Sequence, residues 1–162
     1  MLYLVRYIVN MPVERSAGII IFRNTPRGRR YLVLHAARNV SRVTKFKVTR
    51  DFWDFSKGLL DKGETGLDAA KRETREEAGI SKFKLTPNFK ETAHYFTRRD
   101  GKPILKYVAM FLAEVKSSKV KLSWEHDEHE WLPYKEAHDR ITLPQMKKVL
   151  EKAEKYLERC EY

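Results

Sequence analysis

Cysteine is almost absent from the chain. Its 162 residues contain one, Cys160, which excludes an internal disulfide and a cysteine metal cluster. A chain this poor in cysteine is typical of a reducing compartment, so we expect a cytoplasmic protein. Cys160 is interpreted as a helix-packing residue or a bystander rather than a nucleophile.

Long apolar segments are also absent. No run approaches the roughly 18 residues of a membrane-spanning helix, so we expect no membrane partner. The apolar first ten residues lack a basic start and a small-residue cleavage site, and they are not interpreted as a signal peptide. We expect residues 1–12 to be an N-terminal strand or extension and residues 13–162 to be a single domain. Met11 is a candidate for an alternative start, which the sequence does not decide.

Acidic residues are scarce relative to basic ones, with 22 Asp and Glu against 33 Lys and Arg and a net charge of +11. A positive surface attracts polyanions such as nucleotides, RNA or acidic membranes without choosing among them. The charged surface of a heat-adapted protein is an equally good explanation. Residues 39–51 are expected to form a long loop or a small hairpin. The basic residues of this segment are Arg42, Lys45, Lys47 and Arg50.

Apolar periodicity predicts strands separated by two helices. The expected strands are Ser16–Phe22, Tyr31–Ala36, Lys84–Thr97, Ile104–Val115 and Glu128–Leu132. One helix should begin at Thr65 or Gly66 and end at Gly79. The other spans Pro144–Glu158, with apolar residues at helical spacing: Met146, Val149, Leu150, Ala153 and Leu157. This order predicts an α/β (α+β) fold in which helices sandwich a mixed sheet.

Three glutamates, Glu73, Glu76 and Glu77, fall within one arc of the first helix at about 100° per residue. Their mutual repulsion predicts a bound cation, and carboxylate oxygens suit Mg²⁺ or Mn²⁺. Arg72 is placed to pair with Glu76 or with Glu64. The alternative is a solvated acidic helix face. The neighbouring arcs should pack on the sheet (Leu67, Ala70, Thr74, Ala78) or face solvent (Asp68, Lys71, Arg75).

Residues 58–80 resemble the signature of the Nudix hydrolase family. The matching positions are Gly58, Glu64, Arg72, Glu73, Glu76, Glu77, Gly79 and Ile80, while Thr74 occupies an apolar position of the signature. The resemblance implies an α/β/α sandwich and Mg²⁺- or Mn²⁺-dependent hydrolysis of a nucleoside diphosphate linked to another group. It also implies that the three glutamates and the Gly58 carbonyl bind metal, while Arg72 and Glu64 orient the carboxylates.

Residues 13–157 are further similar to the asymmetrical diadenosine tetraphosphate hydrolase branch of that family. The segments that carry the similarity are residues 53–58, 122–132 and 134–137. The branch implies that Glu125 lies near the metals as a further ligand or base. It also suggests substrate contacts, each with an ordinary surface or packing role as its alternative: Lys57, Lys102, Lys106 and His126 for phosphate, and Tyr95 and Tyr107 for adenine.

The expected reaction is attack of water on phosphorus, which converts diadenosine tetraphosphate to ATP and AMP. The alternatives are a (d)NTP pyrophosphohydrolase and an RNA 5′-end pyrophosphohydrolase. The basic composition favours RNA over (d)NTPs. A non-catalytic nucleotide- or RNA-binding Nudix module is the alternative of another class. The linear sequence contains no aromatic RNA-binding signature. A monomer and a homodimer are both compatible with the sequence.

Overall fold

Two long strands form the centre of the sheet in the computed structural model, which describes residues 11–37 and 51–160. β1 (Val13–Thr25) and β7 (Lys102–Glu114) pair in parallel, while β2 (Gly28–Ala36), β6 (Glu91–Arg99) and β8 (His126–Leu132) pair antiparallel to their neighbours. The short strands β3 (Trp53–Asp54), β4 (Lys57–Leu59) and β5 (Lys84–Leu85) complete it. The prediction of a mixed sheet is confirmed.

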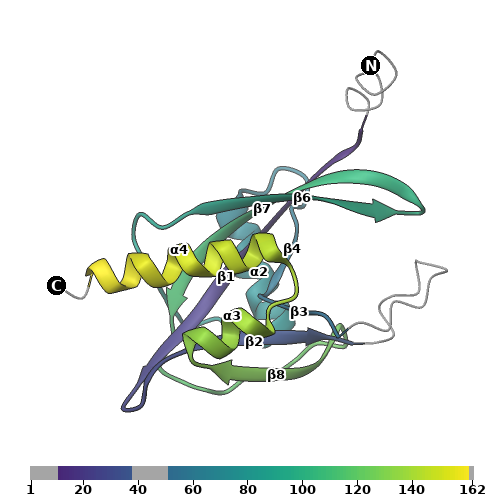
Figure 1. Cartoon of the computed structure of the whole chain (residues 1–162). Helices are drawn as coiled ribbons and strands as arrows, with labels where there is room; N and C mark the ends of the chain where they lie inside the picture. Colours follow the sequence, from purple (N-terminus) through teal and green to yellow (C-terminus); the bar gives the residue numbers. More distant parts are fainter. Residues whose placement is uncertain (1–10, 38–50, 161–162) are drawn as a thin grey trace.

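Alternating side chains divide the core into two layers. Along β1, Ile20 and Phe22 enter one apolar cluster, whereas Ile19 and Ile21 enter the other. The first cluster contains residues of α3 (Tyr134–Arg140) and α4 (Pro144–Cys160), and the second contains residues of α2 (Gly66–Ala78). Helices therefore cover both faces of the sheet (Figure 1), here called the α4 face and the α2 face. The predicted sandwich is confirmed.

Helix α2 begins and ends as its sequence predicts. The Thr65 side chain accepts a hydrogen bond from the Asp68 amide, and Gly79 ends the helix with a φ of 67°, in the left-handed region that glycine tolerates. Its buried residues are Ala69, Ala70, Thr74, Glu77 and Ala78, whereas Asp68, Lys71 and Arg75 are exposed as expected. Leu67 is half-buried. The predicted apolar residues of α4 are all buried, and Cys160 is exposed.

The prediction of one strand over Lys84–Thr97 is wrong at its centre. β5 and β6 are separated by a turn at Pro87 and Asn88, and the φ of Asn88 is +60°. Proline has no amide hydrogen for a strand ladder, and asparagine tolerates the left-handed conformation. A two-residue turn, Asp100–Gly101, joins β6 to β7, with positive φ at both positions.

Some predictions lie outside the described residues. They concern residues 1–10 and most of the basic segment 39–51, including Arg42, Lys45, Lys47 and Arg50. The division of the chain at residue 12 stays a prediction. Among the helices of the described ranges, none is long and apolar enough to span a membrane.

Candidate active site

Gly58 and Glu73 are brought together by the pairing of β4 with β1, in which Gly58 lies opposite Ala17. A Cβ atom at residue 58 would lie 2.1 Å from Cδ and Oε1 of Glu73. The backbone and the carboxyl group can approach this closely because residue 58 has no side chain. Gly58 and Glu73, the first of the three helix glutamates, are thus in direct contact.

Arg72 is the centre of the acidic cluster. It donates to both oxygens of Glu64 (2.9 and 3.0 Å), to Glu73 (2.7 Å), to Glu76 (3.3 Å) and to the Leu59 carbonyl (2.9 Å). The predicted contacts with Glu64 and Glu76 are both confirmed. The guanidinium group lowers the pKa of Glu64 below its usual range. A planar guanidinium with five donors suits this branched arrangement, which fixes the loop before α2 to the helix.

Arg72→Lys should weaken activation by a divalent metal ion about 10- to 100-fold, as loss of a residue that orients metal ligands typically does. Lysine keeps the charge but cannot reach Glu64, Glu73 and Glu76 together. The measurement is turnover as a function of Mg²⁺ concentration. Arg75→Lys, on the exposed side of the same helix, is the matched control. An unchanged Mg²⁺ dependence in Arg72→Lys would contradict a positioning role.

Glu77 is the most buried of the three glutamates, with a side chain that is 8% exposed. Its Oε2 accepts a hydrogen bond from the Lys57 amide (3.1 Å). Burial raises the pKa of Glu77 to about 8, although the Lys57 cation opposes this. Burial also raises the pKa of Glu73, against the effect of Arg72. Two desolvated carboxyl groups favour a nearby cation.

Glu125 approaches this cluster from the segment before β8. The amides of Lys121 and Ser123 donate to the carbonyls of Ala78 (2.9 Å) and Glu77 (3.2 Å), which attaches the segment to the end of α2. The negative charge of Glu125 contributes to the raised pKa of Glu73, so the two carboxyl groups are near each other. The structure therefore places Glu125 beside the glutamate helix, although it is distant in sequence.

His126 lies beside Glu77, with Nε2 3.4 Å from Oε2. Neither ring nitrogen makes a hydrogen bond within the described residues, and both are buried. Burial, reinforced by the positive charge of Lys57, lowers the pKa of this imidazole. A neutral ring can donate one hydrogen bond and accept another.

The donor set fits a divalent cation. Within residues 11–37 and 51–160, no three His, Cys, Asp or Glu side chains already converge as a ready-made metal site. Arg72 instead holds the carboxylates of Glu73 and Glu76. The desolvated oxygens of Glu73 and Glu77, with Glu125 nearby, are hard ligands of the kind that Mg²⁺ and Mn²⁺ prefer.

A second set of charges adjoins the acidic cluster on the α4 face. The Lys57 ammonium forms an ion pair with the buried Asp54 carboxylate at 2.8 Å, and the Lys57 side chain is 13% exposed. Burial acts to lower the pKa of Lys57, but Asp54 raises it overall. The alternative of a solvated Lys57 is therefore wrong. Asp54 was missed in the sequence, because its role depends on a contact that the segment Trp53–Gly58 makes only when folded.

Tyr95 and Lys106 lie opposite each other on β6 and β7, and both face Lys57 and Asp54. Burial raises the pKa of Tyr95 and lowers the pKa of Lys106, which the neighbouring Lys57 lowers further. The name basic cleft is used from here on for the cluster of these four side chains: Lys57, Asp54, Tyr95 and Lys106.

Tyr107 and Lys102 are not part of the basic cleft. Tyr107 follows Lys106 in the strand, so it points to the α2 face. Lys102 is exposed beside the Asp100–Gly101 turn. Of the predicted substrate residues outside the glutamate helix, the structure thus gathers Lys57, Tyr95, Lys106 and His126, and it separates the other two.

Comparisons with known proteins agree with this geometry. The family model described as NUDIX domain matches residues 12–153. The chain is 34% identical over 149 residues to the bis(5′-nucleosyl)-tetraphosphatase (asymmetrical) of Mus musculus, covering 88% of this chain and 95% of that one. It is 33% identical over 113 residues to the RNA pyrophosphohydrolase of Nitratiruptor sp., covering 62% and 73%. The solved binary complex of C. elegans Ap4A hydrolase has a TM-score of 0.73 at 30% identity, covering 89% of this chain and 97% of that one.

Proposed function

The chain belongs to the NUDIX domain family, and from this premise we propose that it hydrolyses diadenosine tetraphosphate asymmetrically, to ATP and AMP. The observation that carries the proposal is the Arg72-centred carboxylate cluster against Gly58, continuous with the basic cleft through Lys57. The amide of Lys57 contacts Glu77 while its ammonium contacts Asp54. One residue thus joins the acidic site to a cationic, aromatic cleft. The asymmetrical tetraphosphatase relatives support the same substrate class.

Nudix hydrolases generally need a divalent metal ion, which we propose to be Mg²⁺ or Mn²⁺ held by Glu73, Glu76, Glu77, Glu125 and the Gly58 carbonyl. When bound, such an ion neutralises phosphate charge and lowers the pKa of water. Arg72 and Glu64 position the carboxylates, and Arg72 must release Glu73 and Glu76 in part for both to serve as ligands. Glu73, Glu76 or Glu125 accepts the proton of the attacking water as the base.

The basic cleft binds the remainder of the substrate. Lys106, whose pKa burial lowers, and Lys57 balance the negative charge of the polyphosphate. Tyr95, half-buried beside Lys57, offers a ring for one adenine. His126 is placed to donate to a phosphate oxygen near Glu77. The adenine and phosphate groups therefore lie on the α4 side of the acidic cluster.

Incubation of the chain with diadenosine tetraphosphate and Mg²⁺ is expected to yield ATP and AMP in equal amounts. In H₂¹⁸O, one heavy oxygen should appear in one of the two products, because water attacks a single phosphorus. Chromatography with mass spectrometry identifies the products. Two molecules of ADP would contradict asymmetrical cleavage, and no turnover would contradict the enzyme assignment.

RNA 5′-end pyrophosphohydrolysis is the second candidate, favoured by the Nitratiruptor relative and by the net charge of +11. Comparison of kcat/KM for diadenosine tetraphosphate, (d)NTPs and 5′-triphosphorylated RNA separates the candidates. A non-catalytic module is disfavoured because the chain retains every acidic residue of the signature. The cytoplasmic location and the choice between monomer and homodimer stay predictions.

A further inference from the structure

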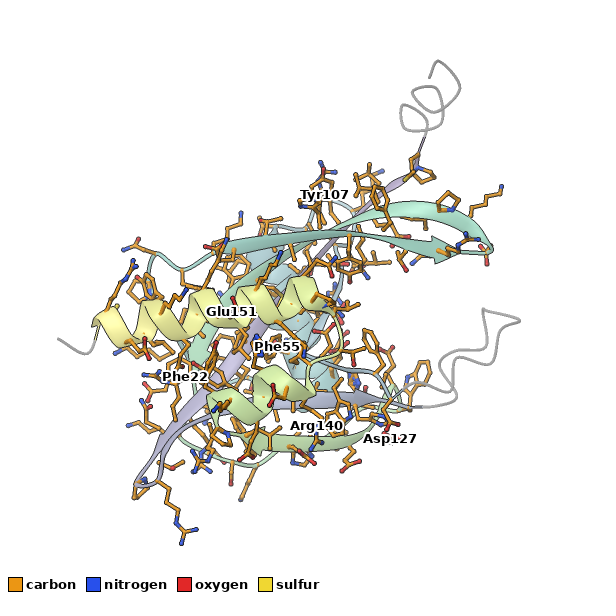
Figure 2. All side chains as sticks on the ribbon, in the orientation of Figure 1. Phe22, Phe55, Tyr107, Asp127, Arg140 and Glu151 are labelled. Atoms are coloured by element: carbon orange, nitrogen blue, oxygen red, sulfur yellow. The ribbon has the colours of Figure 1, made fainter. Side chains whose placement is uncertain are left out.

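Part of the α2 face of the sheet carries exposed aromatic and basic side chains. Phe96 is 70% exposed and Tyr107 is 37% exposed. They lie on β6 and β7, whose turn extends beyond the helices (Figure 1). In Figure 2, Tyr107 lies on the side of these strands away from α4.

Strand register places several basic residues around these rings. His94 lies opposite Tyr107 on β6, and Arg15 lies beside Tyr107 on β1. Because successive side chains alternate, His94, Phe96 and Arg98 share one side of β6. Lys90, which directly precedes β6, lies on the same face, with its ammonium 5.9 Å from the centroid of the Phe111 ring. We call Arg15, Lys90, His94, Phe96, Arg98 and Tyr107 the basic aromatic face.

Ring contacts pre-arrange the centre of this face. The His94 and Tyr107 ring centroids are 5.8 Å apart, and the Arg15 guanidinium lies 6.0 Å from the Tyr107 centroid. A cavity of about 270 Å³ opens between Arg15, Lys90, Thr92 and Tyr107, and no carboxylate lines it. The cavity is thus lined by two cations, a hydroxyl group and one aromatic ring, and its other lining residues are Ser16, Leu60, Gly66 and Ala109.

Acidic residues of the same strands lie on the opposite face. Glu14 pairs with Arg99 at 2.7 Å, and Glu91 pairs with Lys152 of α4 at 2.7 Å. Both carboxylates therefore form ion pairs on the α4 face. Arg15, Lys90 and Arg98 form no ion pair with an acid within the described residues. On the exposed side of the hairpin, the positive charges of Arg15, Lys90 and Arg98 are therefore not balanced by an acid of the same strands.

We propose that the basic aromatic face binds single-stranded RNA, with bases stacked on Phe96 and Tyr107 and phosphates near Arg15, Lys90 and Arg98. Exposed rings accept any base by stacking, and cations beside them follow the backbone. Residues 90–98 of an extended strand span about 26 Å, at 3.3 Å per residue, which exceeds a single nucleotide. The length of the face therefore favours a strand over a mononucleotide.

The position of the face keeps this proposal separate from the catalytic one. The basic cleft is on the α4 face, around Lys57 and Tyr95, whereas the basic aromatic face is on the other side of the same two strands. An RNA with a 5′-hydroxyl end contains no diphosphate to hydrolyse, so its binding can be measured without turnover. Failure of either proposal leaves the other unaffected.

The test is fluorescence anisotropy with a labelled, 5′-hydroxyl ten-nucleotide RNA and the full chain. Phe96→Ala should weaken binding about tenfold, and Phe96→Tyr should retain it, because stacking needs a ring at this position. Arg98→Glu should also weaken binding and reduce the slope of log K against log salt by about 0.7 or more, as expected for a lost phosphate contact on a single strand.

Arg27→Glu is the matched control, since it makes the same charge change at the exposed β1–β2 turn. It should alter binding far less than Arg98→Glu. The proposal is overturned if RNA does not bind, if Phe96→Ala binds as tightly as the unchanged chain, or if Arg27→Glu and Arg98→Glu have equal effects. Sedimentation that shows a dimer dissociated by Phe96→Ala would assign the face to a second copy and also overturn it. Circular dichroism checks that each variant is folded.

Discussion

Glu77→Gln should lower the turnover of diadenosine tetraphosphate about 1,000-fold while the chain remains folded. A carboxylate that helps to hold the metal contributes several kcal/mol to stabilising the transition state, and about 4 kcal/mol corresponds to this factor. Glutamine retains the shape and can still accept the Lys57 amide hydrogen. The expected defect therefore comes from the lost negative charge.

Stability without metal should distinguish this variant from a simple folding defect. Folding raises the pKa of Glu77 from 4.5 to about 8, chiefly through burial. A carboxyl with a raised pKa makes the folded chain less stable as the pH rises through this window, because ionisation is easier when unfolded. At pH 7.5 in EDTA, Glu77→Gln should have a Tm at least as high as that of the unchanged chain.

Steady-state rates at saturating Mg²⁺ and melting curves in EDTA are the two measurements. Glu158→Gln, an exposed position in α4, is the control and should change neither quantity. Near-normal turnover of Glu77→Gln at saturating Mg²⁺ would show that the metal assignment is wrong. A large fall in Tm would show instead that the carboxylate has a structural role.

Gly58→Ala is expected to reduce kcat about 100-fold by displacing Glu73. Its Cβ would lie 2.1 Å from the Glu73 carboxyl group, which is the end of a flexible side chain and can rotate away. The fold should therefore survive while the carboxylate leaves its place, and a misplaced reactive group commonly loses about this factor. The measurements are kcat and the Mg²⁺ concentration for half-maximal rate.

Gly66→Ala is the matched control for this substitution. A Cβ at residue 66 would meet Ala17 and Ala109 at 3.9 and 4.0 Å, which is ordinary contact, and alanine favours the helix that begins there. Its kcat should be unchanged. Equal activity in Gly58→Ala and the unchanged chain would mean that the close approach of Gly58 to Glu73 has no catalytic importance.

Local pattern was sufficient to predict the helix that carries the glutamates. Thr65 and Gly79 mark its ends, and the contacts of Arg72 with Glu64 and Glu76 follow from spacing along one helix and its preceding loop. Helix α3 was not predicted, because it has seven residues and buries only Ala137. So short a helix has no extended apolar stripe for the sequence to display.

The division between the two faces of β6 and β7 was beyond sequence reasoning. Tyr95 faces Lys57, and Tyr107 faces Arg15, because the Asp100–Gly101 turn sets Tyr95 opposite Lys106. A shift of one residue in this register would exchange the two faces. The ion pair between Asp54 and Lys57 could not be predicted from the sequence either, since it needs the bend between β3 and β4.

The attachment of Lys121 and Ser123 to the carbonyls of Ala78 and Glu77 has a mechanical consequence. A displacement of the end of α2 carries the Glu125 segment with it, so the spacing between Glu125 and the helix carboxylates is set within one rigid unit. Gly79, at the end of α2, packs so closely on the Glu125 segment that a Cβ at residue 79 would lie 2.8 Å from Lys121 Cβ. On substrate binding, the distances within this acidic unit should therefore change less than the distances between the unit and the β6–β7 hairpin.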